Sequence, residues 1–404
     1  MSAPTAPRVY IVDAVRTPVG RYRGGLSSVR PDDLAARTIT ALLDRVPAAR
    51  EAVDEVVFGA TNQAGEDNRN VARMALLLAG LPYEVTGVTV NRLCGSGLEA
   101  IQYAYRAIAT GERSVMIAGG VESMTRAPFV MAKAAEAFDR TVPAMFDTSL
   151  GWRFTNPKMA ERFPLESMGD TAENVAALRS ISREAQDRFA LTSHQRAARA
   201  AAEGAFADEL VPVEIAQRKG PAVIVSADES VRADASIEQL AKLAPVFRKG
   251  GSVTAGNSSP INDGASGVLV ASEEFVRKHG LTPLGRVRAN VVASVEPGLM
   301  GLGPIPAMTR ALARAGISAG ALDTVELNEA FAAQALACID SLGLDPARVN
   351  PDGGAIALGH PIGSSGARIA TTLLHRMRRQ GLKLGAASLC IGVGQGIATI
   401  FERD

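Results

Sequence analysis

Short runs of β-branched residues alternate with longer alanine-rich segments along the first part of the chain. The runs at 8–15 and 53–61 are compact and apolar, which is typical of strands buried in a sheet. In the segments 31–46 and 70–80 apolar residues recur at helical spacing, and the first segment begins with a proline while the second ends with a glycine. This alternation predicts an α/β fold in which helices cover a buried sheet.

The same pattern returns in the last part of the chain. Residues 56–82, 90–100 and 114–120 predict a strand and helix, then a strand with a glycine-rich turn and helix, then a strand. Their counterparts repeat this order and are residues 325–344, 349–370 and 386–396. We therefore expect a duplicated α/β unit whose two glycine-rich turns face one another across a shared site.

The segment from Ser123 to Pro260 has a different character. It holds the chain's one tryptophan, Trp152, followed by a helical stretch and a charged stretch. One interpretation is an insertion that forms a lid or a partner surface on the duplicated core. A separately folding domain is the alternative, and the sequence leaves both open.

Composition narrows the classes of function. The chain has 404 residues, 47% of them hydrophobic, and a net charge of +1, so it can bury a large core and has no field that favours nucleic acid or an anionic membrane. Three cysteines and four histidines, without ligand spacing, argue against a disulfide framework and a structural metal site. No signal peptide or membrane span is evident, and we expect a cytoplasmic protein.

Cys94 is the first candidate for chemistry. It stands between a β-branched run and a glycine-rich helix start, where free backbone N–H groups and the helix dipole would favour a thiolate with a lowered pKa. Gly95 and Gly97 add little bulk, which would leave room for a substrate carbonyl. The alternative, a buried structural cysteine, fits this residue alone equally well.

Three further positions suggest chemistry. His360 lies in a glycine-rich turn before a helix, where it can act as a base or a donor. Cys390 begins a tight glycine turn whose backbone N–H groups could face an oxyanion, although an ordinary hairpin is the alternative. Asn328 at a strand end could hold a water or an acyl oxygen, or could cap a helix. Three other histidines are expected at the surface, and one cysteine in the core: His194, His279, His375 and Cys338.

Four motifs taken together change the picture. The segments "NRLCGSGL", "NEAFAAQ", "GGAIALGHPIGSSGAR" and "CIGVGQG" occur in this order, and they resemble those of the thiolases, which transfer acyl groups between coenzyme A thioesters. The likeness extends over essentially the whole chain. It implies two βαβαβαββ halves in an α/β/α/β/α arrangement with an inserted loop domain. The implied units are residues 1–123 completed by 261–283, the insertion 124–260, and the second half 284–404.

The resemblance also implies roles for the candidate residues. Cys94 would be the nucleophile that becomes acylated, His360 would take its proton, and Cys390 would be the second acid or base. One oxyanion site would combine His360 with a water held by Asn328. The other would use the backbone N–H groups of Cys94 and Gly392.

Coenzyme A is the implied co-substrate, with no bound metal or redox cofactor. By resemblance, Arg232 would lie near the adenosine phosphate and Ser259 near the pantetheine, with Phe247 lining the same path. Met168 and Phe331 would line the thioester pocket. Thiolases are commonly dimers or tetramers, so the resemblance implies a homo-oligomer, and the stretch after residue 124 would contribute to a homotetramer.

Two departures bear on the substrate. Ser167 stands where short-chain biosynthetic thiolases often have histidine, and Val393 stands in a turn often written with three glycines. The nearest motif likeness is to 3-oxoadipyl-CoA thiolases of aromatic-acid breakdown, with a general 3-ketoacyl-CoA or acetoacetyl-CoA thiolase as the alternative. A dicarboxylate tail would need a cation, for which Arg153 and Arg69 are candidates, although structural ion pairs are an equal use for them.

Other classes of protein remain as alternatives. A condensing enzyme of fatty-acid or polyketide synthesis would have a histidine or asparagine where this chain has Cys390. A cysteine hydrolase would release its acyl group to water. A non-catalytic acyl-CoA-binding homologue is disfavoured, because all four catalytic positions hold competent residue types.

Overall fold

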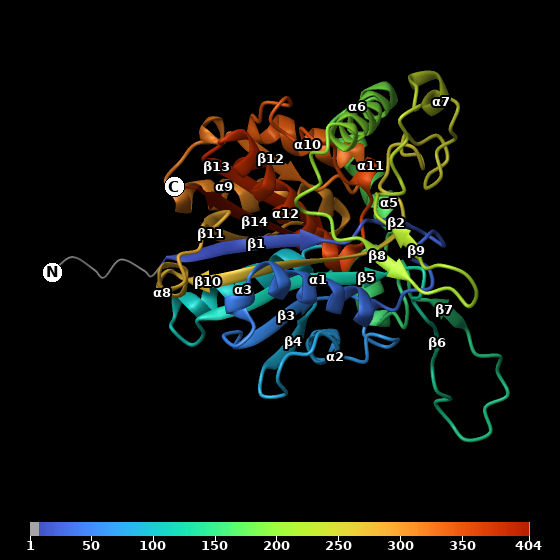
Figure 1. The fold of residues 1–404 in the computed structure, drawn as a ribbon. Helices are drawn as coiled ribbons and strands as arrows, with labels where there is room; N and C mark the ends of the chain where they lie inside the picture. The colour runs from blue at the N-terminus through green and yellow to red at the C-terminus, as the bar shows by residue number, and fades with distance from the viewer. Residues whose placement is uncertain (1–7, 404) are drawn as a thin grey trace.

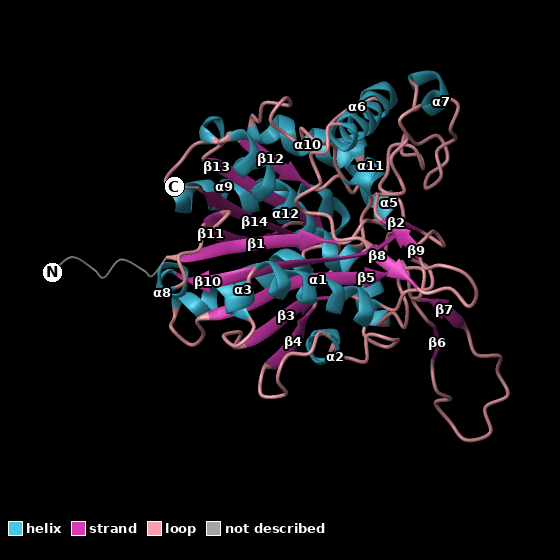
Figure 2. Cartoon of the chain, in the orientation of Figure 1, coloured by secondary structure: helices cyan, strands magenta, loops and turns pink. Residues whose placement is uncertain are grey.

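A mixed sheet runs through the whole protein (Figures 1 and 2). The computed structural model describes residues 8–403, and segment 1–7, part of the N-terminus searched for a signal peptide, lies outside them. The sheet's strand order is β12-β13-β14-β11-β1-β10-β5-β3-β4, with β2 paired to β10. Its strands are β1 (Val9–Arg16), β2 (Gly20–Arg21), β3 (Glu55–Gly59), β4 (Thr86–Val90), β5 (Val115–Ser123), β10 (Asn262–Ser272), β11 (Gly285–Ser294), β12 (Thr324–Leu327), β13 (Leu384–Ile391) and β14 (Gln395–Glu402).

The two sides of this sheet repeat one topology. β1 and β11 meet antiparallel through only two residue pairs, and each is followed outward by the last strand of its own half, β10 or β14. Farther out, β3 is parallel to β4 and β5, as β12 is parallel to β13. Val349 makes a single parallel bridge to Val325, in the place that corresponds to β4. The predicted duplication of an α/β unit is confirmed.

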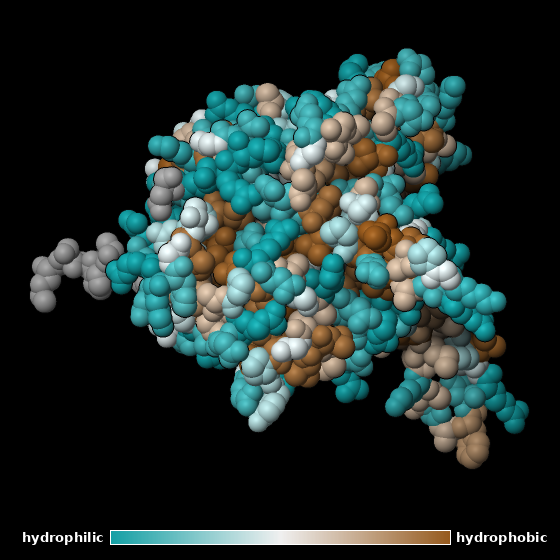
Figure 3. Space-filling model, in the orientation of Figure 1, coloured by the Kyte–Doolittle hydropathy of each residue, from teal (hydrophilic) through white to brown (hydrophobic). Residues whose placement is uncertain are grey.

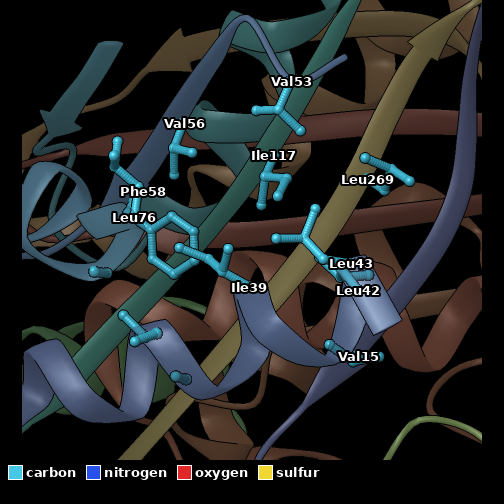
Figure 4. Close-up of a cluster of buried hydrophobic side chains, with 14 of the residues drawn as sticks. Val15, Ile39, Leu42, Leu43, Val53, Val56, Phe58, Leu76, Ile117 and Leu269 are labelled. Atoms are coloured by element: carbon cyan, nitrogen blue, oxygen red, sulfur yellow. The ribbon is translucent and has the colours of Figure 1, made fainter. Parts of the chain in front are cut away.

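Helices form three layers around the two halves of the sheet. α1 (Pro31–Arg45) and α2 (Val71–Leu78) pack on the outer face of the first half, in the apolar cluster of Figure 4. α3 (Ser96–Ala109) and α12 (Ile362–Gln380) lie between the halves and share one core with both. α9 (Pro304–Ala315) and α10 (Ala332–Leu342) cover the outer face of the second half. These layers confirm the predicted α/β/α/β/α arrangement.

A long segment between β5 and β10 carries most of the remaining structure. The chain leaves the sheet after Ser123 and returns at Asn262, where β10 inserts between β1 and β5. Its elements are β6 (Phe129–Met131), β7 (Met145–Asp147), α4 (Pro157–Ala160), α5 (Met168–Leu178), α6 (Arg183–Ala202), β8 (Val213–Ile215), β9 (Val223–Val225) and α7 (Ile237–Ala241). Two short helices outside it are α8 (Glu273–Lys278) and α11 (Ala355–Leu358). The unit boundaries given above stay a prediction.

The surface placement predicted for His375 is wrong. His375 is 2% exposed on α12, and its Nε2 lies 2.7 Å from the carbonyl oxygen of Ala14. The helix has polar residues around it in sequence, but it lies between the two halves of the sheet and is buried along most of its length. Helical spacing alone does not reveal that both sides of a helix are covered. His279, in contrast, is exposed as predicted.

The close crossing of α3 and α12 gives a stability prediction. A Cβ atom on Gly97 would lie 2.6 Å from the backbone nitrogen of Ala367 and 2.9 Å from the carbonyl oxygen of Gly363. Gly97→Ala should therefore lower the free energy of unfolding by about 1–3 kcal/mol, measured by denaturant titration. Gly320→Ala is the matched control, because its Cβ would approach only Ser318 Oγ at 3.9 Å. Equal midpoints for the two variants would contradict the prediction.

Candidate active site

One cavity brings together the candidate residues of both halves. It has a volume of about 240 Å³ and is lined by Cys94 after β4, His360 before α12 and Cys390 near the end of β13. The rest of its wall is mostly apolar: Met124, Leu150, Gly151, Ser167, Met168, Gly169, Phe247, Ser258, Ser259, Pro260, Ile261, Met300, Ala330, Phe331 and Ile362. The two glycine-rich turns of the duplicated unit thus do face a shared site.

Cys94 occupies a tight turn that leads directly into α3. Leu93 before it has a left-handed φ of 45°, a conformation that is strained for a residue with a side chain. Ser96 Oγ accepts a hydrogen bond from the Arg92 N–H at 2.8 Å and donates one to the Leu93 carbonyl at 2.6 Å, which holds the turn. The predicted position of Cys94 at a helix start is confirmed.

The glycines beside Cys94 have a different use from the one predicted. A Cβ on Gly95 would lie 2.6 Å from Ile391 Cδ1, and one on Gly97 would meet the backbone of α12. These positions are closed by the protein itself. Gly95 and Gly97 therefore allow the two halves to pack against each other, and they do not widen the path of a substrate to the sulfur.

The pKa of the Cys94 thiol is raised to about 11, chiefly because burial disfavours the thiolate. Hydrogen bonds from the Gly392 and Cys94 backbone N–H groups oppose this shift, and the charge of Glu122 adds to it. The prediction of a lowered pKa is wrong, since loss of water outweighs the helix start. In the resting protein Cys94 is a neutral thiol that needs a base.

His360 is arranged to be that base. Its Nδ1 lies 2.6 Å from Ser365 Oγ, and Ser365 Oγ itself donates to the Pro361 carbonyl at 2.8 Å. Because the single hydroxyl proton is used there, Ser365 accepts from Nδ1–H, and Nε2 keeps its lone pair. Nε2 is buried without a protein partner, and the residue lines the cavity. Burial, with the charge of Arg368, lowers the pKa of His360 to about 4, so the ring is neutral.

Cys390 lies in β13, one residue from its end, and the turn that follows forms another wall of the site. Val393 and Gly394 have left-handed φ values of 62° and 80°, so a β-branched residue occupies a position that suits glycine. Burial raises the pKa of Cys390 well above its usual range, and proximity to Cys94 raises it further. Cys390 is therefore held as a thiol, a form that can give a proton.

Asn328 follows β12, but it does not line the cavity. Its backbone N–H donates to the Ser388 carbonyl at 2.9 Å, while both polar atoms of its amide are buried without a protein partner. The nearby helix α10 has Phe331 as its N-cap, so the interpretation of Asn328 as a helix cap is wrong. Its free amide leaves donor and acceptor capacity for a water or a ligand.

The sequence did not lead us to Glu122, which forms hydrogen bonds to both halves of the fold next to the site. Its buried carboxylate accepts hydrogen bonds from Thr61 N and Oγ1, from Asn62 N, and from Gly363 N near His360. The first three come from the first half of the fold and the last from the second half. An acidic residue at the end of the apolar run 115–121 was the available signal, because a buried charge requires partners.

The residues assigned to coenzyme A and to the thioester pocket divide between two adjoining cavities. Met168, Phe247, Phe331 and Ser259 line the cavity of Cys94, where the rings of Phe247 and Phe331 meet edge to face at 6.1 Å. Ser259 Oγ donates to the Ala330 carbonyl at 3.1 Å.

Arg232 lines a second cavity of about 490 Å³, which shares Ser258 and Pro260 with the first. His194 also lines this second cavity, and its predicted surface placement is wrong. It is 5% exposed, and its Nδ1 accepts a hydrogen bond from the Arg232 N–H at 3.2 Å. Burial, with the charge of Arg232, lowers the pKa of His194 to about 4.

Comparison with known families accounts for this architecture. The family description "Thiolase, N-terminal domain" matches residues 9–274, and "Thiolase, C-terminal domain" matches residues 281–403. The chain belongs to the thiolase family. The predictions of an α/β thiolase fold and of an acyltransferase are confirmed, and the cysteine hydrolase and fatty-acid condensing enzyme are set aside.

Individual thiolases resemble the chain along its whole length. It is 56% identical over 397 residues to the 3-oxoadipyl-CoA/3-oxo-5,6-dehydrosuberyl-CoA thiolase of Escherichia coli K12, covering 98% of this chain and 99% of that protein. The acetyl-CoA acetyltransferase of Chromobacterium violaceum is 46% identical, with coverage of 98% and 99%. The crystal structure of human mitochondrial 3-ketoacyl-CoA thiolase in complex with CoA aligns with a TM-score of 0.92 and 42% identity, covering 99% of this chain and 98% of that one.

The raised pKa of Cys94 predicts how the site responds to pH. The thiolate fraction of a thiol with a pKa of about 11 rises about tenfold per unit between pH 7 and 9, so alkylation of Cys94 by iodoacetamide should rise in step. The rate is measured by mass spectrometry of the peptide that contains Cys94, with the Cys338 peptide as an internal reference for a buried thiol. A plateau near pH 7 would reveal a preformed thiolate–imidazolium pair and contradict the prediction.

Proposed function

We propose that the protein cleaves 3-oxoadipyl-CoA with coenzyme A to give acetyl-CoA and succinyl-CoA, through an acyl group on Cys94. The observation that carries the chemistry is the convergence of two thiols and a neutral histidine in one apolar cavity. The second cavity, which holds Arg232 and opens beside Ser258 and Pro260, supports entry of coenzyme A from that side. The same steps in reverse are a Claisen condensation.

His360 Nε2 takes the proton of Cys94 as the sulfur attacks the 3-keto carbon, because this lone pair has no protein partner. The bond between carbons 2 and 3 then breaks, its electrons pass to the acetyl-CoA enolate, and Cys390 protonates the enolate carbon. Coenzyme A finally gives its thiol proton to the Cys390 thiolate and attacks the acyl-Cys94 thioester. The departing Cys94 sulfur takes back the proton held by His360, and succinyl-CoA is released, so all three side chains return to their starting forms.

Two sites would stabilise the negative charge that develops on oxygen. The N–H groups of Cys94 and Gly392 already face the Cys94 sulfur, which supports a role toward the oxygen of its acyl group. His360 and a water held by the free amide of Asn328 would serve the enolate oxygen. No metal is required for either role.

The proposed substrate is taken from the activities named for similar thiolases. It is tested with two acyl-CoA substrates that differ only at the end of the acyl chain. Curated relatives at 56% identity include the beta-ketoadipyl-CoA thiolase of Acinetobacter baylyi. The experiment measures kcat/KM for thiolysis of 3-oxoadipyl-CoA and of 3-oxohexanoyl-CoA, which has the same length without a terminal carboxylate. A clear preference for the dicarboxylate supports the proposal, and equal rates would leave a general 3-ketoacyl-CoA thiolase, which the apolar wall of the cavity would suit.

Ser167 supports the preference for longer substrates over acetoacetyl-CoA. It lines the cavity as the N-cap of α5, where its Oγ donates to Asp170 Oδ2 at 2.7 Å and accepts from the Asp170 N–H. The serine is thus explained by helix capping. No imidazole stands at this point of the wall.

We further propose that the protein is a cytoplasmic homo-oligomer, either a dimer or a tetramer. Among the described residues, no helix is long and apolar enough to cross a membrane. The β6–β7 hairpin projects from the body and carries apolar side chains (Figure 3), five of which are at least 63% exposed: Phe129, Met131, Phe138, Val142 and Met145. Such a patch suits contact with another copy.

The hairpin gives a test of the assembly. Replacing Phe138 and Val142 by serine should lower the molar mass in light scattering after size exclusion, because their side chains are 97% and 94% exposed and would lose an apolar contact between copies. Leu178→Ser on α5, which also changes an exposed apolar residue, serves as the control. An unchanged mass for the double variant would contradict the role of the hairpin.

A further inference from the structure

Two arginines line a third cavity. Arg69 and Arg153 come from segments far apart in the chain, before α2 and after β7, and both contribute to this cavity of about 750 Å³. The rest of its wall is rich in amides and hydroxyls: Thr61, Asn62, Gln63, Ala64, Gly65, Asn68, Asn91, Val130, Thr148 and Phe154. The polar character of this wall contrasts with the apolar cavity of Cys94.

The acids near Arg69 in sequence do not pair with it. Asp67 is buried, and burial, with the charge of Glu122, raises its pKa to about 7. Glu66 pairs instead with Arg126 at hydrogen-bonding distance and with Arg30 at 3.4 Å. Among residues 8–403, neither Arg69 nor Arg153 makes an ion pair with a carboxylate. Within the described part of the chain, Arg69 and Arg153 therefore form no structural ion pair, which was the alternative use considered for them.

The loop that holds Arg69 is fixed by its own backbone. Asn68 and Arg69 have left-handed φ values of 51° and 64°, and the Arg69 N–H donates to the Gln63 carbonyl at 3.0 Å. Asn68 Nδ2 donates to the Glu66 carbonyl at 3.1 Å. This conformation is costly for residues with side chains, and its hydrogen bonds keep the arginine at the cavity.

The third cavity adjoins the catalytic one through two segments. Asn91 lines the third cavity and belongs to the loop that carries Cys94, and its side chain accepts from the Leu93 N–H at 2.9 Å. Along the strand-to-loop segment after β7, Thr148 and Arg153 line the third cavity while Leu150 and Gly151 line the catalytic one. The short segment 148–153 thus contributes to the walls of both cavities.

The described residues that line the catalytic cavity include no cationic partner for an anionic chain end. None of its lining residues is a lysine or an arginine, and burial keeps His360 neutral. In a succinyl group on Cys94, the free carboxylate stands only two methylene groups from the acyl carbon. A carboxylate left in the mostly apolar cavity would lose hydration without gaining a cationic partner, which is costly.

We infer that Arg69 and Arg153 bind the terminal carboxylate of a dicarboxylic acyl chain, which extends from Cys94 past Leu150 and Gly151 to the third cavity. This inference rests on the proposed function and adds the residues that would set its substrate class. A guanidinium offers paired N–H donors that match a carboxylate, and hydrogen bonds between charged groups are stronger than those between neutral groups. Amides such as Asn91 can donate to the same group.

The test compares two substrates in the full-length protein. Wild type, Arg69→Gln, Arg153→Gln and the double variant are assayed for kcat/KM on 3-oxoadipyl-CoA and on 3-oxohexanoyl-CoA. We expect each single variant to lower the ratio of the first to the second by about tenfold or more, as the loss of one charged hydrogen bond implies. Arg153→Lys should retain part of the preference for 3-oxoadipyl-CoA, because lysine keeps the positive charge but lacks the paired N–H donors of arginine.

Arg310→Gln is the matched control, because Arg310 is an exposed arginine on α9, far from this cavity in the fold, and should leave the ratio unchanged. If Arg69→Gln and Arg153→Gln lose no activity, or lose it equally on both substrates, the ratio stays constant. That result would overturn the inference while leaving the proposed substrate intact. A wild-type protein that does not favour 3-oxoadipyl-CoA would overturn the proposed substrate itself. The neutral substrate reports in every case whether the variant is folded.

Discussion

Replacing Cys94 by alanine should lower kcat/KM for thiolysis by on the order of a thousandfold or more. The thiol lines the cavity with His360 and Cys390, and His360 Nε2 is buried there without a protein partner. Without the sulfur, the acyl group has no covalent carrier between the two halves of the reaction. The rate is measured with 3-oxohexanoyl-CoA and free coenzyme A, and the acylated Cys94 peptide is sought by mass spectrometry.

Cys338 provides the control for this experiment. It is buried in α10, where its thiol donates to the Gly301 carbonyl with a separation of 3.3 Å, and it does not line the cavity. Cys338→Ala should retain turnover close to that of the wild type. If Cys94→Ala also retained turnover, the proposed mechanism would be wrong. The non-catalytic acyl-CoA-binding alternative would be supported only if the wild type and Cys338→Ala were both inactive.

The candidate catalytic residues could be identified from the sequence because they lie in local patterns. Cys94 precedes a helix with apolar periodicity, and His360 lies in a glycine-rich turn before another helix. The duplication was visible because each half repeats the same order of strands and helices. These signals act over a few residues, and the structure preserves them.

Properties that depend on packing could not be predicted in this way. The pKa of Cys94 depends on how much water the surrounding apolar wall excludes, and this wall comes from both halves. His194 and His375 are buried because separate elements cover the helices that carry them. Arg69 and Arg153 were candidates from motifs alone, and only the fold places them at one cavity.

The protonation states of the site suit its two thiols to different steps of the proposed reaction. Neutral His360 faces the cavity with a lone pair, so it can accept a proton from Cys94. Cys390 is held protonated by its burial and by the nearby sulfur, so it can supply a proton to carbon. The apolar wall favours this arrangement because it penalises every charged form before substrate arrives. Breaking a carbon–carbon bond should therefore depend on Cys390 more than sulfur exchange does.

Cys390→Ala should lower thiolysis of a 3-oxoacyl-CoA by about a hundredfold to ten-thousandfold, the range expected for loss of a general acid. Exchange of labelled coenzyme A into acetyl-CoA should fall by no more than about tenfold, because this exchange needs only acyl transfer to Cys94 and back. No carbon acid is formed in the exchange, so the proton carried by Cys390 has no part in it. Both rates are measured on the same preparation, which separates a chemical loss from misfolding.

His360→Ala is the informative comparison, because His360 would serve as the base for Cys94 in both reactions. It should lower thiolysis and exchange together, each by about a hundredfold or more. Equal losses of both rates in Cys390→Ala would instead mean that the second thiol maintains the shape of the cavity. A retained exchange with abolished thiolysis can arise only if the two sulfur atoms have different tasks, one carrying the acyl group and the other moving the proton on carbon.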